Sequence, residues 1–120
     1  ENGGLAAAHA VNDGFAQEPQ AHGMYHGEKV AFGTLVQLVL EKAPQEELEQ
    51  VLAFLRDTGL PLTLAQLGVK EIVPETLKKV AEAAVVPTQS TKNLRADITA
   101  QEVYDAILEA DRIGRDYLAR

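Results

Sequence analysis

Apolar residues recur along the chain at the three- and four-residue spacing that places side chains on one face of a helix. The clearest example follows Pro44, where Leu48, Val51, Leu52 and Leu55 share a face. A proline at the first helical position and glutamates in the first turn favour a helix start there, and the glycine and proline after the apolar run end it. The pattern therefore predicts a helix in the middle of the chain.

Other stretches with the same period predict an all-α bundle of about five or six helices and no sheet. The second predicted helix is apolar almost all round, which indicates burial on most sides. Residues 87–98 are predicted to be an exposed polar loop. Besides the helix after Pro44, the predicted segments are Leu5–Phe15, Gly27–Lys42, a short turn of helix at Thr63–Leu67, a helix from Pro74, and a last helix that the capping box of Thr99 and Glu102 opens.

Composition narrows the class of protein. A chain of 120 residues is long enough for one domain with a core, and its low aromatic content of 5% favours packing by Ala, Leu and Val between helices. The net charge of −7 disfavours nucleic acid and anionic membranes as partners. The sequence has no cysteine, no signal peptide and no apolar run near the roughly 20 residues that span a bilayer. We therefore expect a cytoplasmic protein without disulfides.

The three histidines carry most of the candidate chemistry. His9 lies among alanines, which let another element approach closely, and His26 begins a predicted helix, whose positive end favours the neutral imidazole that binds metals. The spacing of 17 residues allows a shared metal ion but is not diagnostic. The alternative is a hydrogen-bonded core histidine at position 9 and surface histidines elsewhere. A catalytic zinc needs a third protein ligand, for which His22, Asp13, Glu28 and a residue outside the chain all stay open.

Other catalytic arrangements are not found in the sequence. It has no cysteine nucleophile and no Gly-x-Ser-x-Gly motif, and the pair Gly3-Gly4 follows no strand that would make it a phosphate-binding loop. The glutamates Glu46, Glu47 and Glu49 are predicted to form a solvated helix face.

Three long segments carry a resemblance to a known family. They are Gly3–Ala10, Tyr25–Glu41 and Gly59–Gly68. They are similar to segments of the glycerol dehydrogenases, in the iron-containing (group III) alcohol dehydrogenase superfamily. The resemblance covers essentially the whole chain and implies that residues 1–120 are the C-terminal helical, metal-binding domain of a dehydroquinate synthase-like fold. The N-terminal NAD-binding domain would then be absent from this chain, and its start at Glu1, without a methionine, also leads us to expect a fragment.

The resemblance implies a zinc ion held by two histidines and one aspartate in a cleft between two domains. Carried onto this sequence, the histidines are His9 and His26, and the aspartate is expected upstream of Glu1. His22 matches no ligand position of the family and stays a runner-up. The implied reaction oxidises glycerol to dihydroxyacetone, with zinc as the Lewis acid and NAD as the hydride acceptor.

Further expectations follow from the same resemblance. Phe15 and Tyr25 are candidate substrate-pocket residues, although core or loop packing is the more common role for each. No catalytic or NAD-binding residue is assigned within the chain, so we expect it to be inactive alone. We also expect a homo-oligomer, with exchange of the N-terminal helix as one way to cover apolar surface. Two alternatives stay open: a non-catalytic helical module that binds a partner through its Ala-rich helix, and a relative that uses iron and another alcohol such as 1,2-propanediol.

Overall fold

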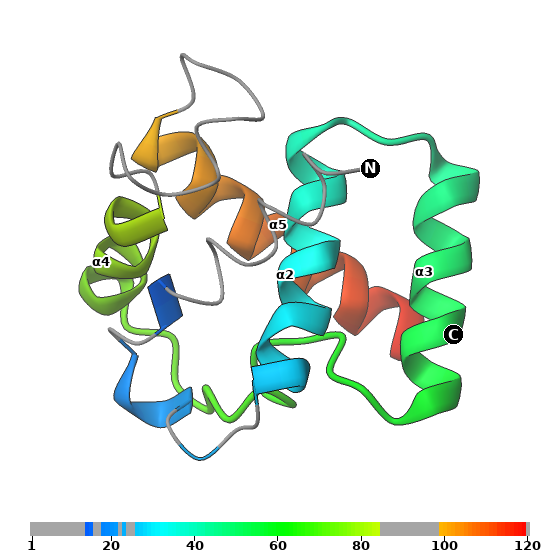
Figure 1. The fold of residues 1–120 in the computed structure, drawn as a ribbon, viewed down its shortest axis with the longest axis horizontal. Coiled ribbons are helices and arrows are strands. Elements are labelled where there is room, and N and C mark those ends of the chain that lie inside the picture. Colours follow the sequence, from blue (N-terminus) through cyan, green and yellow to red (C-terminus); the bar gives the residue numbers. More distant parts are fainter. Residues whose placement is uncertain (1–13, 16–17, 22, 24–25, 85–98, 120) are drawn as a thin grey trace.

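The helices are taken from a computed structural model, which describes residues 14–15, 18–21, 23, 26–84 and 99–119. This part of the chain contains four α-helices, one short 3-10 helix and no strand (Figure 1). The predicted all-α class is therefore confirmed for these residues. The elements are η2 (Pro19–Ala21), α2 (His26–Leu40), α3 (Gln45–Thr58), α4 (Pro74–Ala84) and α5 (Ala100–Leu118).

Helix α5 organises the fold because it packs against both α2 and α4, while α3 packs against α2. In Figure 1, α2 and α3 run antiparallel side by side, α4 lies on the other side of α2, and α5 crosses α2 obliquely. Large side chains from these helices and from the segment between α3 and α4 meet in one core. Those that are almost fully buried include Phe15, Phe32, Leu35, Leu52, Leu62, Leu64, Leu67, Leu77 and Ile107.

Local signals set the ends of α3 and α5. Pro44 is the N-cap of α3 with an extended ψ of 153°, so it precedes the helix rather than forming its first turn. Gly59 ends α3 in the left-handed conformation, with a φ of 77° that suits glycine. At α5, Thr99 Oγ1 accepts from the Glu102 N–H at 3.1 Å, and Glu102 Oε1 accepts from the Thr99 N–H at 3.0 Å. The predicted capping box is confirmed.

Helix α2 ends without a glycine. Lys42 takes the left-handed conformation, with a φ of 56°. The Ala43 N–H donates to the Leu38 carbonyl at 3.0 Å, and the Lys42 N–H donates to the Val39 carbonyl at 3.1 Å. These two bonds form a Schellman motif, which satisfies the last carbonyls of the helix. The helix therefore ends two residues before the predicted boundary.

The described part of the chain has four α-helices, and the predicted total of about five or six stays a prediction because it includes residues outside the described ones. The predicted short turn of helix at Thr63–Leu67 is a single hydrogen-bonded turn. Of the predicted helix Leu5–Phe15, only residues 14–15 are described, and the predicted loop 87–98 lies outside the described residues. None of the described helices is long and apolar enough to cross a membrane.

The chain between α3 and α4 shows why that turn does not continue as a helix. The Leu67 N–H donates to the carbonyls of Thr63 at 3.1 Å and Leu64 at 3.0 Å, which completes one turn. Gly68 then takes a positive φ of 105°, and the Val69 N–H donates a hydrogen bond to the Leu64 carbonyl at 2.8 Å. A glycine in this conformation stops the helix directly after its first hydrogen bonds.

Candidate functional site

Of the predicted ligands, His26 is the first residue of α2. The sequence analysis predicted this position at a helix start. His9, His22 and Tyr25 lie outside the described residues. The zinc-ligand role of His9 and His26 therefore stays a prediction.

Phe15, a candidate pocket residue, lies in the core. Its side chain has no exposed area and meets the Phe32 ring edge to face, with the ring centroids 6.2 Å apart and the planes at 75°. Such aromatic pairs stabilise a core beyond the area that they bury. The packing joins the segment before η2 to the middle of α2, and the substrate-pocket role of Phe15 stays a prediction.

Glu18 is a buried acid in the stretch of sequence between His9 and His26. Its side chain is 1% exposed, and its Oε2 accepts from the Gln20 backbone N–H at 3.1 Å. Its Oε1 is buried and has no hydrogen-bond partner among the described residues. A buried carboxylate oxygen without a partner is unfavourable, so it marks a place where a donor or a cation is expected.

Gln20 ties this stretch to the loop before α4. Its Nε2 donates to the Glu71 carbonyl at 2.8 Å, and its Oε1 accepts from the backbone N–H groups of Lys70 at 3.0 Å and Glu71 at 3.1 Å. Sequence analysis assigned no role to Glu18 or Gln20. The residues Glu-Pro-Gln carry no local signal for a partner 50 positions away, so nothing in the sequence reveals this contact.

An apolar groove of about 360 Å³ lies between α2 and α3, beginning one residue after His26. Phe54 is one of the residues that line this groove, and its side chain is 61% exposed. Glycerol has a hydroxyl on every carbon, and each hydroxyl needs a hydrogen-bond partner when it is buried. The groove therefore does not suit a small polyol. Its lining includes Gly27, Val30, Ala31, Thr34, Val51, Phe54, Leu55 and Leu60.

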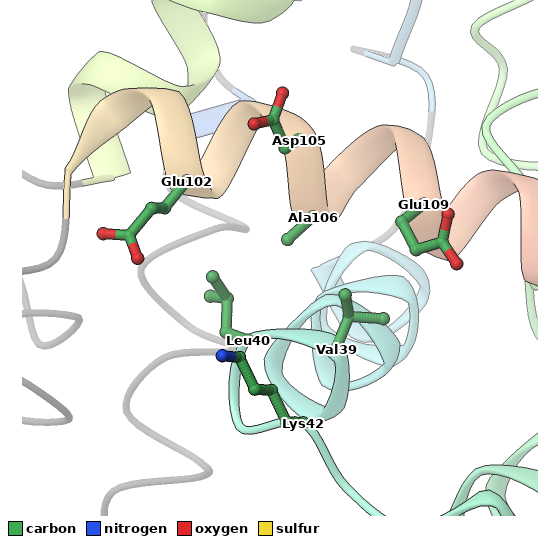
Figure 2. A pocket seen from close by; sticks show the side chains of 7 residues that line it. All are labelled: Val39, Leu40, Lys42, Glu102, Asp105, Ala106 and Glu109. Atoms are coloured by element: carbon green, nitrogen blue, oxygen red, sulfur yellow. The ribbon is translucent and has the colours of Figure 1, made fainter.

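Figure 2 shows an open pocket of about 240 Å³ between the end of α2 and α5. In Figure 2, Val39 and Leu40 at the end of α2 face Ala106 of α5, whereas the carboxylate of Asp105 points away from α2. The lining includes three acids and one lysine; its residues are Val39, Leu40, Lys42, Glu102, Asp105, Ala106 and Glu109. Each acid already accepts a hydrogen bond on its own helix, from Thr99, Gln101 and Arg112 in turn. No group of three metal-binding side chains occurs in the described part of the chain. The pocket is therefore not assigned as a metal site.

The exposed side of α5 carries a small ion-pair network. Arg112 Nε donates to Glu109 Oε1 at 3.0 Å, and Arg112 Nη1 donates to Asp116 Oδ2 at 2.7 Å. The hydrogen bond from Arg112 lowers the pKa of the Glu109 carboxyl, with a smaller effect of the positive charge itself. Glu109, and after it Asp116, raise the pKa of the Arg112 guanidinium. Because these groups are exposed, the network contributes little to stability and has no catalytic geometry.

Asp111, by contrast, is a buried acid with a structural partner on another segment. Its side chain is 5% exposed, its Oδ1 accepts from the Leu64 N–H at 2.8 Å, and its Oδ2 accepts from Arg115 Nε at 3.0 Å. Both carboxylate oxygens are thus satisfied, and the acid joins α5 to the turn between α3 and α4.

No protein-family model matches this chain. It is, however, similar in sequence and in structure to glycerol dehydrogenases. It is 54% identical to a glycerol dehydrogenase of Escherichia coli O6:H1 over 118 residues. The aligned region covers 98% of this chain and 32% of that protein. A crystal structure of a probable glycerol dehydrogenase from Sinorhizobium meliloti 1021 matches with a TM-score of 0.87 and 43% identity, over 92% of this chain and 32% of that one. The glycerol dehydrogenase structure from Schizosaccharomyces pombe matches with a TM-score of 0.88 and 37% identity, and the match covers 93% of this chain and 29% of that one. The chain spans about a third of the length of these relatives.

Proposed function

Because this chain is a homologue of the glycerol dehydrogenases over about a third of their length, we propose that it supplies part of the metal centre of such an enzyme. His9 and His26 are two of the zinc ligands in this proposal, and an aspartate outside the chain is the third. The whole protein oxidises glycerol to dihydroxyacetone with NAD. The observation that carries the proposal is the extent of the likeness, which spans 98% of the chain and so includes both histidine segments.

The donors fit zinc. Imidazole nitrogens and a carboxylate are common ligands of a catalytic zinc. His26 begins α2, where the positive helix end favours the neutral ring that binds a metal. In the stretch between the two histidines, the unpartnered Glu18 Oε1 is a buried acceptor that suits a nearby donor or cation.

The two histidines have a limited task in this proposal. When bound, zinc supplies the Lewis acidity that lowers the proton affinity of a substrate oxygen. His9 and His26 would hold the ion, whereas NAD binding and hydride acceptance would belong to the rest of the protein. The chain alone should therefore not reduce NAD in the presence of glycerol, and an increase in NADH absorbance would contradict this part of the proposal.

Zinc titration by calorimetry tests the proposed ligands. We expect the chain to bind zinc weakly, because one ligand is missing, and we expect His9→Ala and His26→Ala each to abolish that binding. His22→Ala is the matched control, since it removes a histidine four residues before His26 in the sequence that is outside the proposed pair. Equal zinc binding by the parent chain and His26→Ala, or no binding by the parent, would contradict the proposal.

A non-catalytic helical module is the alternative function. The apolar groove between α2 and α3, with Phe54 exposed, supports it because such surfaces suit protein partners. A chelator separates the two functions. It should lower the melting temperature of a chain that holds zinc, and it should leave that of a metal-free module unchanged.

A relative that uses iron and another alcohol, such as 1,2-propanediol, is the alternative among enzymes. Metal analysis of the whole protein, together with rates on glycerol and 1,2-propanediol, distinguishes it from the zinc enzyme. We also propose a homo-oligomer and a cytoplasmic location for the whole protein, in keeping with the family resemblance. A single monomeric species in sedimentation at high concentration would contradict the proposed oligomer.

A further inference from the structure

We propose that residues 18–21, which include η2, form a conformational strap that docks against the loop before α4 and detaches from it while the rest of the fold stays intact. The inference goes beyond the proposed function and does not depend on it, because it invokes no metal ligand. Three features carry it: an apolar anchor at Gly14 and Phe15, a polar contact through Gln20, and the buried carboxylate of Glu18.

The anchor lies between α2 and α4. The Phe15 ring has no exposed area and meets the Phe32 ring of α2 edge to face. A Cβ on Gly14 would overlap the backbone carbonyl oxygen of Val80 in α4, so the two backbones are in close contact. Figure 1 shows this short stretch, in dark blue, between α4 and α2. The Glu18 N–H donates to the Phe15 carbonyl at 3.0 Å, which joins the start of the strap to the anchor.

The contact of the strap with the loop before α4 consists of hydrogen bonds that water can reach. The Gln20 amide donates to the Glu71 carbonyl at 2.8 Å and accepts from the N–H groups of Lys70 at 3.0 Å and Glu71 at 3.1 Å. Lys70 and Glu71 are exposed, and Gln20 is half-buried. When such bonds open, bonds to water replace them, so the net cost of opening is small. This contact should therefore open before the core does.

Glu18 makes the docked state less favourable. Its side chain is 1% exposed, and its Oε2 accepts from the Gln20 N–H at 3.1 Å. Its Oε1 is buried and has no hydrogen-bond partner in the described part of the chain. Burial of a carboxylate oxygen without a donor is unfavourable, and in the detached state water supplies that donor. Hydration of Glu18 therefore offsets the loss of the Gln20 bonds, which keeps the two states close in free energy.

The loop that receives the strap has its own supports. The Val69 N–H donates to the Leu64 carbonyl at 2.8 Å, and Val69 is 2% exposed. Where α4 begins, the Leu77 N–H donates to the Val73 carbonyl at 3.1 Å. These bonds do not involve the strap, so detachment should expose the loop amides and the strap carboxylate without unfolding α4.

Native-state hydrogen exchange measures the detached state directly. The amides of Lys70 and Glu71, here called the loop amides, report detachment, and the amide of Ile107 in the core of α5 reports global unfolding. Exchange is followed at urea concentrations below the unfolding transition. We expect the loop amides to exchange faster than the Ile107 amide, with little dependence on urea, because detachment exposes little surface.

Glu18→Gln and Gln20→Ala should shift this equilibrium in opposite directions. Glu18→Gln keeps the shape and an oxygen that accepts from the Gln20 N–H but removes the buried charge, so the loop amides should exchange about fivefold more slowly. Gln20→Ala removes the bonds to the loop, and exchange should be about tenfold faster. Gln101→Ala is the matched control, because it removes an exposed glutamine that bonds along its own helix. It should leave the loop amides unchanged.

The slower exchange in Glu18→Gln separates a strap from a purely structural contact, because loss of a supporting carboxylate would not slow the opening. Faster or unchanged exchange in this variant would overturn the proposal. A Glu18→Gln chain that circular dichroism shows unfolded would do the same, because the carboxylate would then stabilise the docked state. Loop amides that exchange only as fast as the Ile107 amide would also overturn it, because the strap would then open only with the whole fold. None of these outcomes affects the zinc titration that tests the proposed function.

Discussion

At the scale of single residues, Asp111 shows how one buried acid fixes a turn. It lies on the inner side of α5, and its Oδ1 accepts from the Leu64 N–H in the turn between α3 and α4. That N–H is buried, so without Asp111 it would have neither this acceptor nor water. Because Arg115 donates to the other oxygen, the charge is also paired.

Asp111→Ala should therefore destabilise the chain by about 2–3 kcal/mol, since a buried N–H loses a charged acceptor. Asp116→Ala is the control, because Asp116 is exposed and pairs with Arg112 along its own helix. Its effect should stay below about 0.5 kcal/mol. Urea unfolding of the two variants measures both changes. Equal stabilities would show that the bond to Leu64 contributes nothing.

The Glu109–Arg112 pair gives a pH prediction of definite sign. Arg112 lowers the pKa of Glu109 below its ordinary value of 4.5, so the pair stabilises the fold above the unfolded-state pKa. That small contribution is lost as the pH falls through the lowered folded-state pKa. Arg112→Ala should raise the pKa of Glu109 toward its ordinary value, which an NMR titration of the side chain measures. Arg56→Ala, on the exposed side of α3, should leave the titration of Glu109 unchanged. A raised Glu109 pKa in Arg56→Ala and not in Arg112→Ala would contradict the role of Arg112.

Burial of individual acids shows what the sequence predicts at this scale. Glu46, Glu47 and Glu49 were predicted to be solvated; Glu46 and Glu47 are exposed, whereas Glu49 is half-buried. Glu18 stands in an equally polar stretch, yet it is buried. Two residues on, Gln20 bonds to residues about fifty positions away in the loop before α4. Helical periodicity does not describe such contacts.

At the scale of elements, Gly114 allows α5 to approach the segment that follows α3. A Cβ at this position would overlap the backbone carbonyl oxygen of Leu62. The neighbour is backbone from another segment, so it cannot move aside as a flexible side chain does. The absence of a side chain at position 114 therefore determines how closely the two elements pack.

Gly114→Ala should destabilise the chain by about 2–3 kcal/mol through overpacking, despite the higher helix propensity of alanine. Gly27→Ala is a matched control in α2, because a Cβ there meets nothing within 4 Å. That control should be neutral or stabilising, by up to about 1 kcal/mol. Thermal unfolding of both variants checks the pair. A stabilising Gly114→Ala would contradict the close approach.

Periodicity and caps predicted α3, α4 and α5 well, since the residues that start and end them are local. The capping box at Thr99 and the left-handed Gly59 are where the sequence analysis expected them. The end of α2 was predicted two residues too late, because lysine rarely takes the left-handed conformation seen at Lys42. The turn after Pro61 contains helical residues, but Gly68 closes it after one turn.

At the scale of the whole molecule, the four described helices form one core around α5, and the fold matches solved glycerol dehydrogenase structures. The resemblance of the sequence predicted this relationship, and the comparisons confirm it. For the proposed metal centre, the sequence predicted two ligands, His9 and His26, and their role stays a prediction. The chain spans about a third of the length of its relatives.

X-ray absorption at the zinc edge, on the chain loaded with zinc, tests the central claim most directly. The account predicts two imidazole nitrogens at about 2.0–2.1 Å from the metal. One of them should disappear in His9→Ala and in His26→Ala, and both should stay in His22→Ala. A first shell without imidazole, or one that His26→Ala leaves unchanged, would contradict the claim that this chain holds two ligands of a dehydrogenase metal centre.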